Sequence, residues 1–356
     1  MRTTPFYTRL AHVLFCLIAL IYIAIIGETV IAPLLFGLLF ALLLLPLARF
    51  LEFRLKFKRA LATTVTLVCM SVLVLSVLFF LIGQLSDLSG DIPAFREQLL
   101  KATTSLQDWV SDTFHVDNSD QIAYVNQAAD GALAKGTSLA GEALLSVSSI
   151  VLFLVFTFLY TFFILLYRRL LLRFIVALFA EEHVGIVNGA VAEIRFIVKR
   201  YVSGLLIQMA IVAALTCSAF GVFGIKYAMI LGLVTGIFNV IPYIGIFVSL
   251  LLSLLVTFAT GTSTDVLFVL IALFVIHLFD SNFVMPKIVG SQVKINPLAA
   301  LLGLFVGEMI WGVKGMFLSI PMIAVLKVVF DRVDGLKPWG IFVGEEVVVE
   351  KPSPDE

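Results

Sequence analysis

The sequence is poor in charged residues and in cysteine. Asp, Glu, Lys and Arg make up 13% of its 356 residues, and the formal net charge is zero. The total charge therefore identifies no partner, and we expect none that is a nucleic acid. Cys16, Cys69 and Cys217 lie inside apolar segments and no Cys-x-x-Cys occurs, which argues against a disulfide framework and a zinc site.

Motifs that bind nucleotides or catalytic metals are also missing. The chain has no Walker A loop, no dinucleotide-binding glycine fingerprint and no His-Glu zinc-protease motif. These absences leave an ATP-driven pump without support, and the lack of an arginine-rich helix does the same for a voltage sensor. We expect neither an enzyme nor a bound cofactor or metal.

The sequence is rich in long apolar runs. Hydrophobic residues make up 61% of the chain, and the mean hydropathy is +1.11. Because runs of about 18 apolar residues predict membrane-spanning helices, we predict an all-α polytopic membrane protein. The first run is interpreted as a retained span, since no small-residue cleavage site follows it. The six clear spans are 10–26, 29–48, 60–83, 144–167, 203–224 and 264–285.

Two further apolar segments break in the middle. Segment 227–258 is interrupted at 239–245, and segment 298–330 is interrupted between Glu308 and Gly315. Each is longer than the ~20 residues of one span but too short for two full crossings with a loop. Paired interruptions of this kind are typical of the binding site of a secondary transporter.

The distribution of Lys and Arg predicts an orientation. Loops 49–59 and 168–200 are basic, whereas 84–143 is acidic. Because short basic loops stay in the cytoplasm, we place both termini there and 84–143 outside.

The two broken segments leave two topologies open. As re-entrant hairpins they give six spans, and as full crossings they give eight. Lys287 and Lys294, with no acid nearby, favour the hairpins. Hairpins would also make 203–259 and 264–330 an inverted repeat in the C-terminal half, as in secondary transporters.

The insert 84–143 has apolar residues at alternating spacings of three and four, which place them on one face of a helix. Such a stripe must be buried, either by self-assembly into a homo-oligomer or by a hairpin that closes on itself or lies on the bilayer. The stripe consists of Leu85, Leu88, Ile92, Phe95, Leu99, Leu106 and Trp109 or Val110.

We predict five parts in the chain, divided by these spans and loops. They are membrane helices 1–3 in 1–83, an extracytoplasmic amphipathic helical insert in 84–143, membrane helix 4 with a cytoplasmic amphipathic helix in 144–202, a transport core of two span-plus-hairpin repeats in 203–335, and a cytoplasmic tail in 336–356.

Polar residues inside the apolar segments are the candidate contacts for an ion or substrate, because polar groups are costly in a bilayer. Glu308 is predicted about 15 Å into its helix, where it could hold a proton or cation. Lys314 is its expected partner, either at that site or in a pair that holds the hairpin tip. Asp280 and Asn282, expected to point in similar directions, could coordinate a cation. The alternative is a solvated helix end, with Asp280 paired to Lys287.

The break at 239–245 supplies further candidates, Asn239, Pro242 and Gly245. Proline removes a helical hydrogen bond and glycine tolerates unusual backbone angles, so freed carbonyls there could contact an ion or substrate. A kink packed by its neighbours is the alternative. The predicted hairpin or hinge positions are Gly290, Gly312 and Gly315.

Three more polar residues are interpreted mainly as structural. His277 is expected to be a core histidine, with a His–Asp proton relay as the alternative. Gln208 and Thr235 are interpreted as helix–helix contacts.

Several motifs together carry a family resemblance. They are Ile-Pro-Tyr-Ile-Gly at 241–245, Asp-x-Asn-x-x-x-Pro-Lys-Ile-Val-Gly at 280–290, and Pro-Leu followed by Gly-x-x-Gly-Met-x-x-x-x-Pro within 297–321. With Tyr-x-x-Gly at 201–204 and the acidic insert, they resemble the autoinducer-2 exporter family of bacterial inner-membrane permeases. The chain departs from the usual pattern of that family at Leu205, Ile246 and Asp280, where Gln, Pro and Glu are common.

The resemblance implies an oligomeric multi-pass permease of the bacterial cytoplasmic membrane, linked to autoinducer-2 export or to sodium–proton exchange. We therefore expect a secondary transporter that moves a small polar solute or a monovalent cation, coupled to an ion or proton gradient and surrounded by lipids. The alternatives are a Na⁺(Li⁺)/H⁺ antiporter and an oligomeric pore or assembly protein.

Overall fold

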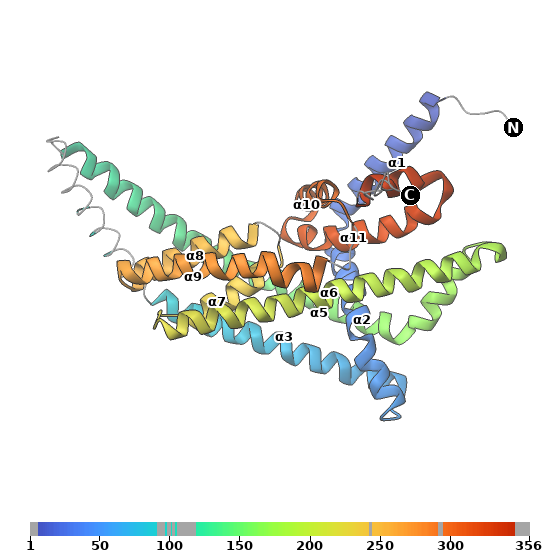
Figure 1. The fold of residues 1–356 in the computed structure, drawn as a ribbon, viewed down its shortest axis with the longest axis horizontal. Helices are drawn as coiled ribbons and strands as arrows, with labels where there is room; N and C mark the ends of the chain where they lie inside the picture. The colour runs from blue at the N-terminus through green and yellow to red at the C-terminus, as the bar shows by residue number, and fades with distance from the viewer. Residues whose placement is uncertain are drawn as a thin grey trace, which may run out of the picture. The chain divides into compact units, whose positions relative to one another are not determined.

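The computed structural model describes residues 6–90, 97, 101, 104, 119–241, 244–290 and 295–345. Within them the chain forms eleven α-helices and no β-sheet, as the sequence predicts (Figure 1). The α-helices are α1 (Phe6–Ile26), α2 (Glu28–Phe53), α3 (Arg59–Ser89), α5 (Ser119–Ala177), α6 (Val184–Val222), α7 (Ala228–Phe238), α8 (Ile244–Thr260), α9 (Ser263–Phe279), α10 (Pro297–Trp311), α11 (Val313–Arg332) and α12 (Lys337–Val343). Short 3-10 or π-helical turns are η1 (Glu181–His183), η2 (Asp280–Val284), η3 (Pro286–Gly290) and η4 (Asp334–Leu336).

Six helical segments of the described chain are long and apolar enough to cross a membrane. Their number equals the predicted number, but the membership differs. The first predicted span lies in α1, which has 21 residues, and Leu10–Ile26 within it is one of the shorter apolar helices, whereas the second half of the last broken segment is among the six. The six are Glu28–Phe53, Arg59–Gln84, Ser148–Ala177, Glu181–Val222, Ser263–Ile288 and Val313–Arg332.

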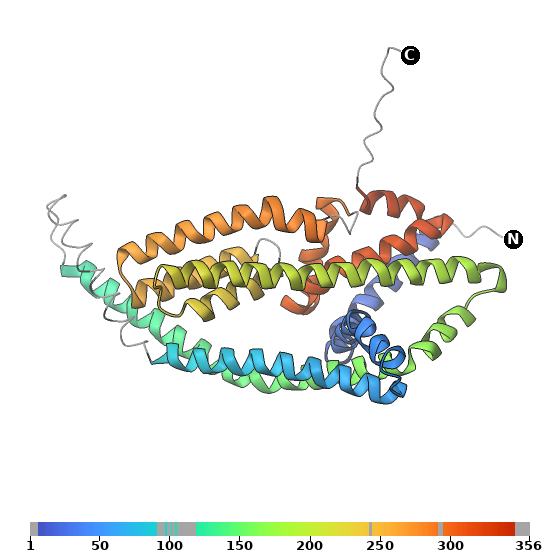
Figure 2. The same cartoon turned by 60° about the horizontal axis from the view of Figure 1, so that its bottom comes forward.

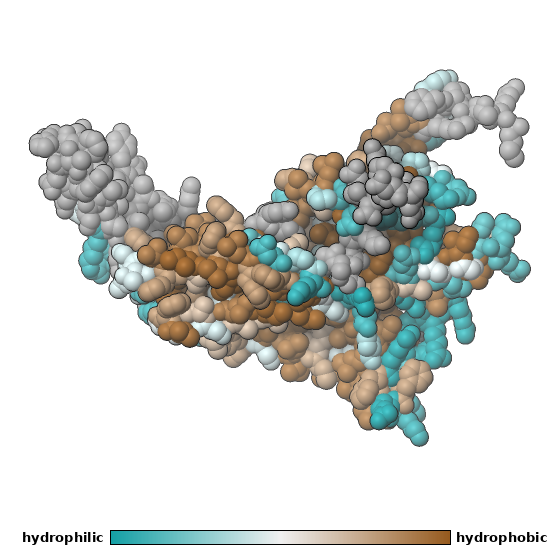
Figure 3. Space-filling model, in the orientation of Figure 1, coloured by the Kyte–Doolittle hydropathy of each residue, from teal (hydrophilic) through white to brown (hydrophobic). Residues whose placement is uncertain are grey.

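Apolar side chains face outward on these helices and on the shorter helix α8. Figure 3 shows them as a brown surface over α8 and α9, where Leu270 and Phe274 are among the exposed residues. A soluble monomer rarely exposes so much apolar surface, whereas a helix in lipid needs it.

The chain divides into two compact units, each built from separate stretches of sequence. The first unit comprises Met1–Val68, Phe153–Leu205 and Lys287–Glu356, and Ala41, Ala48 and Leu165 form a buried cluster in it. The second comprises Cys69–Leu152 and Leu206–Pro286. Its buried cluster consists of Phe220, Ile225, Ile230, Leu231, Val269 and Leu273.

The first broken segment folds back as a helical hairpin of α7 and α8, within the second unit. Glycines allow α7 to pack closely against α6. A side chain at Gly232 would clash with Cys217, and one at Gly236 would clash with the Met209 carbonyl. At the turn, a Cβ on Gly245 would overlap the Phe238 carbonyl. Position 245 therefore requires glycine, the residue without a Cβ.

The second broken segment is also a hairpin, formed by α10 and α11 within the first unit (Figure 2). Gly312 makes the turn with φ 58° and ψ −137°, a conformation almost restricted to glycine. Beside the turn, Gly307 and Gly315 touch backbone to backbone, and a Cβ on either would overlap the other's carbonyl. Both predicted breaks thus separate two helices.

The helix α6 runs unbroken from Val184 to Val222. The cytoplasmic amphipathic helix expected within 144–202 and the span expected at 203–224 are therefore joined in one helix. The apolar stripe expected in 84–143 lies outside the described side chains, so the homo-oligomer that it suggested stays a prediction, as does the five-part division of the chain.

Candidate functional site

Helix α9 ends in two consecutive π-helical turns. It begins with a capping box, in which Thr262 Oγ1 accepts from Asp265 N at 3.3 Å and the Asp265 carboxylate accepts from Thr262 N at 2.7 Å. At its other end Met285 N donates to Asp280 O, five residues back, which opens the first π turn. Such turns are rare and often occur at functional sites, where the wider turn redirects side chains.

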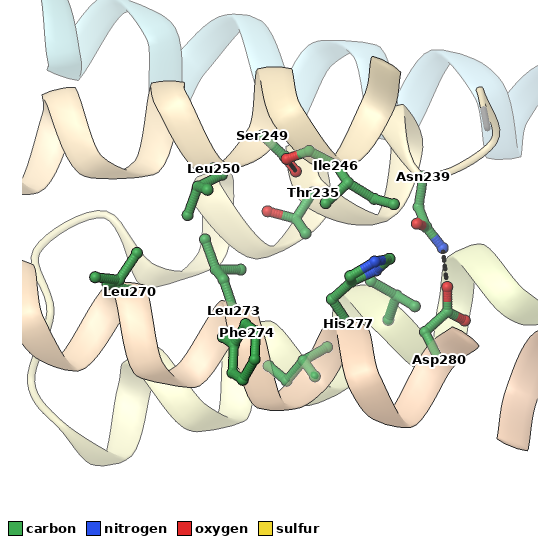
Figure 4. Close-up of a pocket in the computed structure, with 12 residues that line it drawn as sticks. Thr235, Asn239, Ile246, Ser249, Leu250, Leu270, Leu273, Phe274, His277 and Asp280 are labelled. Atoms are coloured by element: carbon green, nitrogen blue, oxygen red, sulfur yellow. Dashed lines mark hydrogen bonds between the residues drawn. The ribbon is translucent and has the colours of Figure 1, made fainter. Parts of the chain in front are cut away.

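The Asp280 carboxylate is buried at the start of these turns, with 4% of the residue exposed. Gln208 Nε2 on α6 donates to Oδ1 at 3.0 Å and to Oδ2 at 2.9 Å. Asn239 Nδ2, at the end of α7, donates to Oδ2 at 3.0 Å (Figure 4). Three elements of the second unit thus converge on one acid.

All of these donors are neutral amides. In the described chain, no Lys or Arg lies within ion-pair distance of Asp280. A buried carboxylate is costly without a compensating charge, and amide hydrogen bonds offset only part of that cost. The amides therefore leave the negative charge of Asp280 without a compensating positive charge among the described residues.

A cavity of about 140 Å³ adjoins the carboxylate, which is room for several water molecules. Figure 4 shows Thr235, Asn239 and Ser249 with oxygen atoms at its wall, and His277 beside Asp280. The His277 ring contacts the Ser281 hydroxyl at 3.4 Å. The remaining lining is largely apolar, including Leu250, Leu270, Leu273 and Phe274.

The structure brings together only some of the predicted residues. Asn239 and Asp280 meet directly, whereas Asn282 is exposed and its amide donates to Leu278 O at 2.7 Å. Asp280 and Asn282 therefore do not point in similar directions, because residues two apart on a helix lie on nearly opposite faces. Gly245 serves the packing of the turn, and Pro242 lies outside the described residues.

The other predicted residues lie in the first unit. Glu308 is exposed on α10 and forms no side-chain hydrogen bond or ion pair within the described chain. The sequence predicts that Lys314 pairs with Glu308. Instead, Lys314 forms an ion pair with Glu28 at the start of α2. Beside this pair, Trp311 Nε1 donates to Ala24 O at 2.9 Å. The hinge glycines Gly312 and Gly315 shape the α10–α11 turn, and Gly290 ends η3.

Gln208 forms a helix–helix contact, as the sequence predicts, and its partner is Asp280. It supplies two of the three hydrogen bonds that the described residues donate to this carboxylate, and is itself 5% exposed. The sequence signal for a polar partner is the amide inside an apolar span. Among the described residues, no three His, Cys, Asp or Glu side chains gather as a metal site.

Comparison with known proteins decides the family. The family model described as AI-2E family transporter matches residues 14–335. The chain belongs to the AI-2E transporter family. It is therefore a multi-pass membrane transporter and not an enzyme.

Three named relatives each match more than four fifths of the chain. The chain is 29% identical to YrrI of Bacillus subtilis (strain 168), named as a candidate transport protein, over 85% of this chain and 86% of the relative. It is 24% identical to the AI-2 transport protein TqsA of Escherichia coli (strain K12), over 86% and 87% of the two chains. A candidate transport protein of Thermotoga maritima is 24% identical over 82% and 85%.

Proposed function

We propose that this AI-2E family member is a secondary transporter in which Asp280 couples movement of a proton to that of a monovalent cation or small polar solute. The supporting observation is the buried carboxylate that, among the described residues, only neutral amides hold. Such a group binds one positive charge at a time, a proton or another cation. If a proton and another cation compete for one carboxylate, binding of one releases the other, and this competition is the basis of an exchanger.

The chemistry around Asp280 suits a small hard cation. The Nδ2 atom of Asn239 faces the carboxylate, so its amide oxygen is turned elsewhere at the cavity wall (Figure 4). With the hydroxyls of Thr235 and Ser249, it adds neutral oxygen atoms to the lining. Hard cations take carboxylate, carbonyl and hydroxyl oxygens as ligands.

The α7–α8 hairpin supports the re-entrant topology. Helix α7 rises only about 16 Å and α8 about 25 Å, so neither crosses a hydrocarbon core of ~30 Å. In the second hairpin α10 rises about 22 Å, whereas α11 is long enough to cross. In secondary transporters, broken helices of this kind surround sites near the middle of the bilayer. We place the protein in a bacterial cytoplasmic membrane with both termini inside, on the basis of its basic loops.

Cation exchange is testable with the purified chain in liposomes that hold a pH dye. We expect an imposed Na⁺ or Li⁺ gradient to drive proton movement that empty liposomes do not show, with K⁺ as the comparison ion. No proton movement with any of them would overturn the cation exchanger. Solute export would then be the better proposal, tested by autoinducer-2 retention in cells, since TqsA is named for AI-2 transport.

The carboxylate of Glu308 provides a matched comparison. It is exposed and lies outside the cavity beside Asp280, so we expect Glu308→Gln to keep most of the exchange activity. The liposome assay measures this directly. Loss of exchange in this variant would move the coupling site to the tip of the α10–α11 hairpin, as the sequence had suggested.

A further inference from the structure

A second cavity, within the first unit, is lined by α2, the end of α5 and the start of α6. Its volume is about 550 Å³, within the range of about 300–1,000 Å³ that is usual for ligand sites. The cavity combines two kinds of lining. One part is apolar, with Leu38, Leu42, Leu45, Ile164, Leu172 and Ile175, and the other carries Arg49, Arg168, Arg169 and Arg195.

Among the described residues, the positive charge of the four arginines is not balanced by an equal number of nearby carboxylates. Glu52 forms an ion pair with Arg168, lies 3.9 Å from Arg169 and also 3.5 Å from Arg59. No acidic side chain lines the cavity in the described chain. One carboxylate thus serves three guanidinium groups.

Arg49 and Arg195 have no ion-pair partner among the described residues. They are also close enough to repel each other, and Arg195 is partly buried. Two like charges placed together beside an apolar wall are unfavourable unless an anion joins them. The guanidinium group is well shaped for a phosphate, which it can bind through two parallel hydrogen bonds.

We propose that this cavity binds an anionic two-chain phospholipid, with the headgroup phosphate between Arg49 and Arg195 and an acyl chain along the apolar wall. A free phosphate ester would satisfy the arginines but leave the apolar wall uncovered. The lining residues belong to candidate membrane spans, where lipid is the surrounding solvent. Basic pockets between membrane helices are known to hold anionic headgroups.

Native mass spectrometry of the purified full-length chain tests the proposal. The probes are phosphatidylglycerol and phosphatidylcholine with identical acyl chains. We expect phosphatidylglycerol to be retained in preference. In the double variant Arg49→Gln/Arg195→Gln its affinity should fall about 10- to 30-fold, because each arginine near an anionic headgroup contributes about a factor of five.

Arg54→Gln is the matched control, since Arg54 is exposed near the end of α2 and does not line the cavity. It should keep the affinity of the unmodified protein. Leu42→Phe narrows the apolar part of the cavity without removing charge, and should weaken lipid binding. Thermal unfolding checks that each variant is folded.

Four results would overturn the lipid site. Equal retention of the two lipids would show no headgroup preference, and an equal loss in Arg54→Gln would show only general charge attraction. Displacement of the lipid by an equal concentration of glycerol 3-phosphate would identify a small-anion site. If instead a second copy of the chain covers the cavity, the double variant will change the oligomer mass and phosphatidylglycerol will not bind.

Discussion

Replacing Asp280 by Asn is expected to abolish cation-coupled proton movement while leaving the protein folded. Asparagine keeps the shape of the side chain, and its one oxygen in the place of Oδ2 can still accept hydrogen bonds from Gln208 and Asn239, while the bond to Oδ1 is lost. It carries no negative charge and exchanges no proton. The rate in the liposome assay should therefore fall by about 100-fold or more, the usual effect of losing an essential acid–base group.

Stability should move in the opposite direction from activity in this variant. The unmodified protein buries a carboxylate with no basic partner among the described residues, and a neutral asparagine side chain in its place would not carry that desolvation cost. We expect the thermal unfolding midpoint in detergent to be unchanged or raised. A lowered midpoint together with lost transport would show that Asp280 is structural.

Asn282→Ala is the control for Asp280→Asn. Its side chain is exposed and, within the described chain, hydrogen-bonds only to the carbonyl of Leu278 on its own helix, so transport should be unaffected. If the control variant lost transport as completely as Asp280→Asn, the effect would belong to the π-helical turns and not to the buried acid.

The α10–α11 hairpin gives the second large effect, on stability. In Gly315→Ala the new methyl group would overlap the backbone of Gly307, so the two helices must separate near their turn. We expect this variant to lower the free energy of unfolding by roughly 1–3 kcal/mol, the usual cost of overpacking. Thermal and denaturant unfolding in detergent measure the change.

Gly189→Ala is the matched control for that substitution. Gly189 lies in α6, is exposed, and has open space where a Cβ would be. Alanine is the better helix former there, so the free energy of unfolding should rise by up to about 1 kcal/mol. A stabilising Gly315→Ala would contradict the close contact between α10 and α11.

The breaks in the helices could be predicted because their causes are local. Gly312 ends α10 through its own backbone angles, and α7 ends just before Asn239 in the stretch where Pro242 and Gly245 interrupt the apolar pattern. Such signals are visible within a few residues of sequence. The same holds for the apolar runs that predicted the spans.

The partners of the polar residues could not be predicted in this way. Asp280 meets Gln208 across 72 residues, and Lys314 meets Glu28 across 286. Sequence spacing suggested the near neighbours Asn282 and Glu308 instead. Only the packing of α6, α7 and α9 brings Gln208, Asn239 and Asp280 together.

The ion pair between Glu28 and Lys314 also bears on the order of synthesis. At about 5–20 residues per second, its second member follows its first by roughly 15–60 s. The unit that holds Asp280 has left the ribosome once residue 286 is clear, whereas the other unit still waits for its final hairpin. Throughout that interval Glu28 has been synthesised but Lys314 has not. The first unit, which contains α1 and α2, is therefore completed by the last helices to be synthesised.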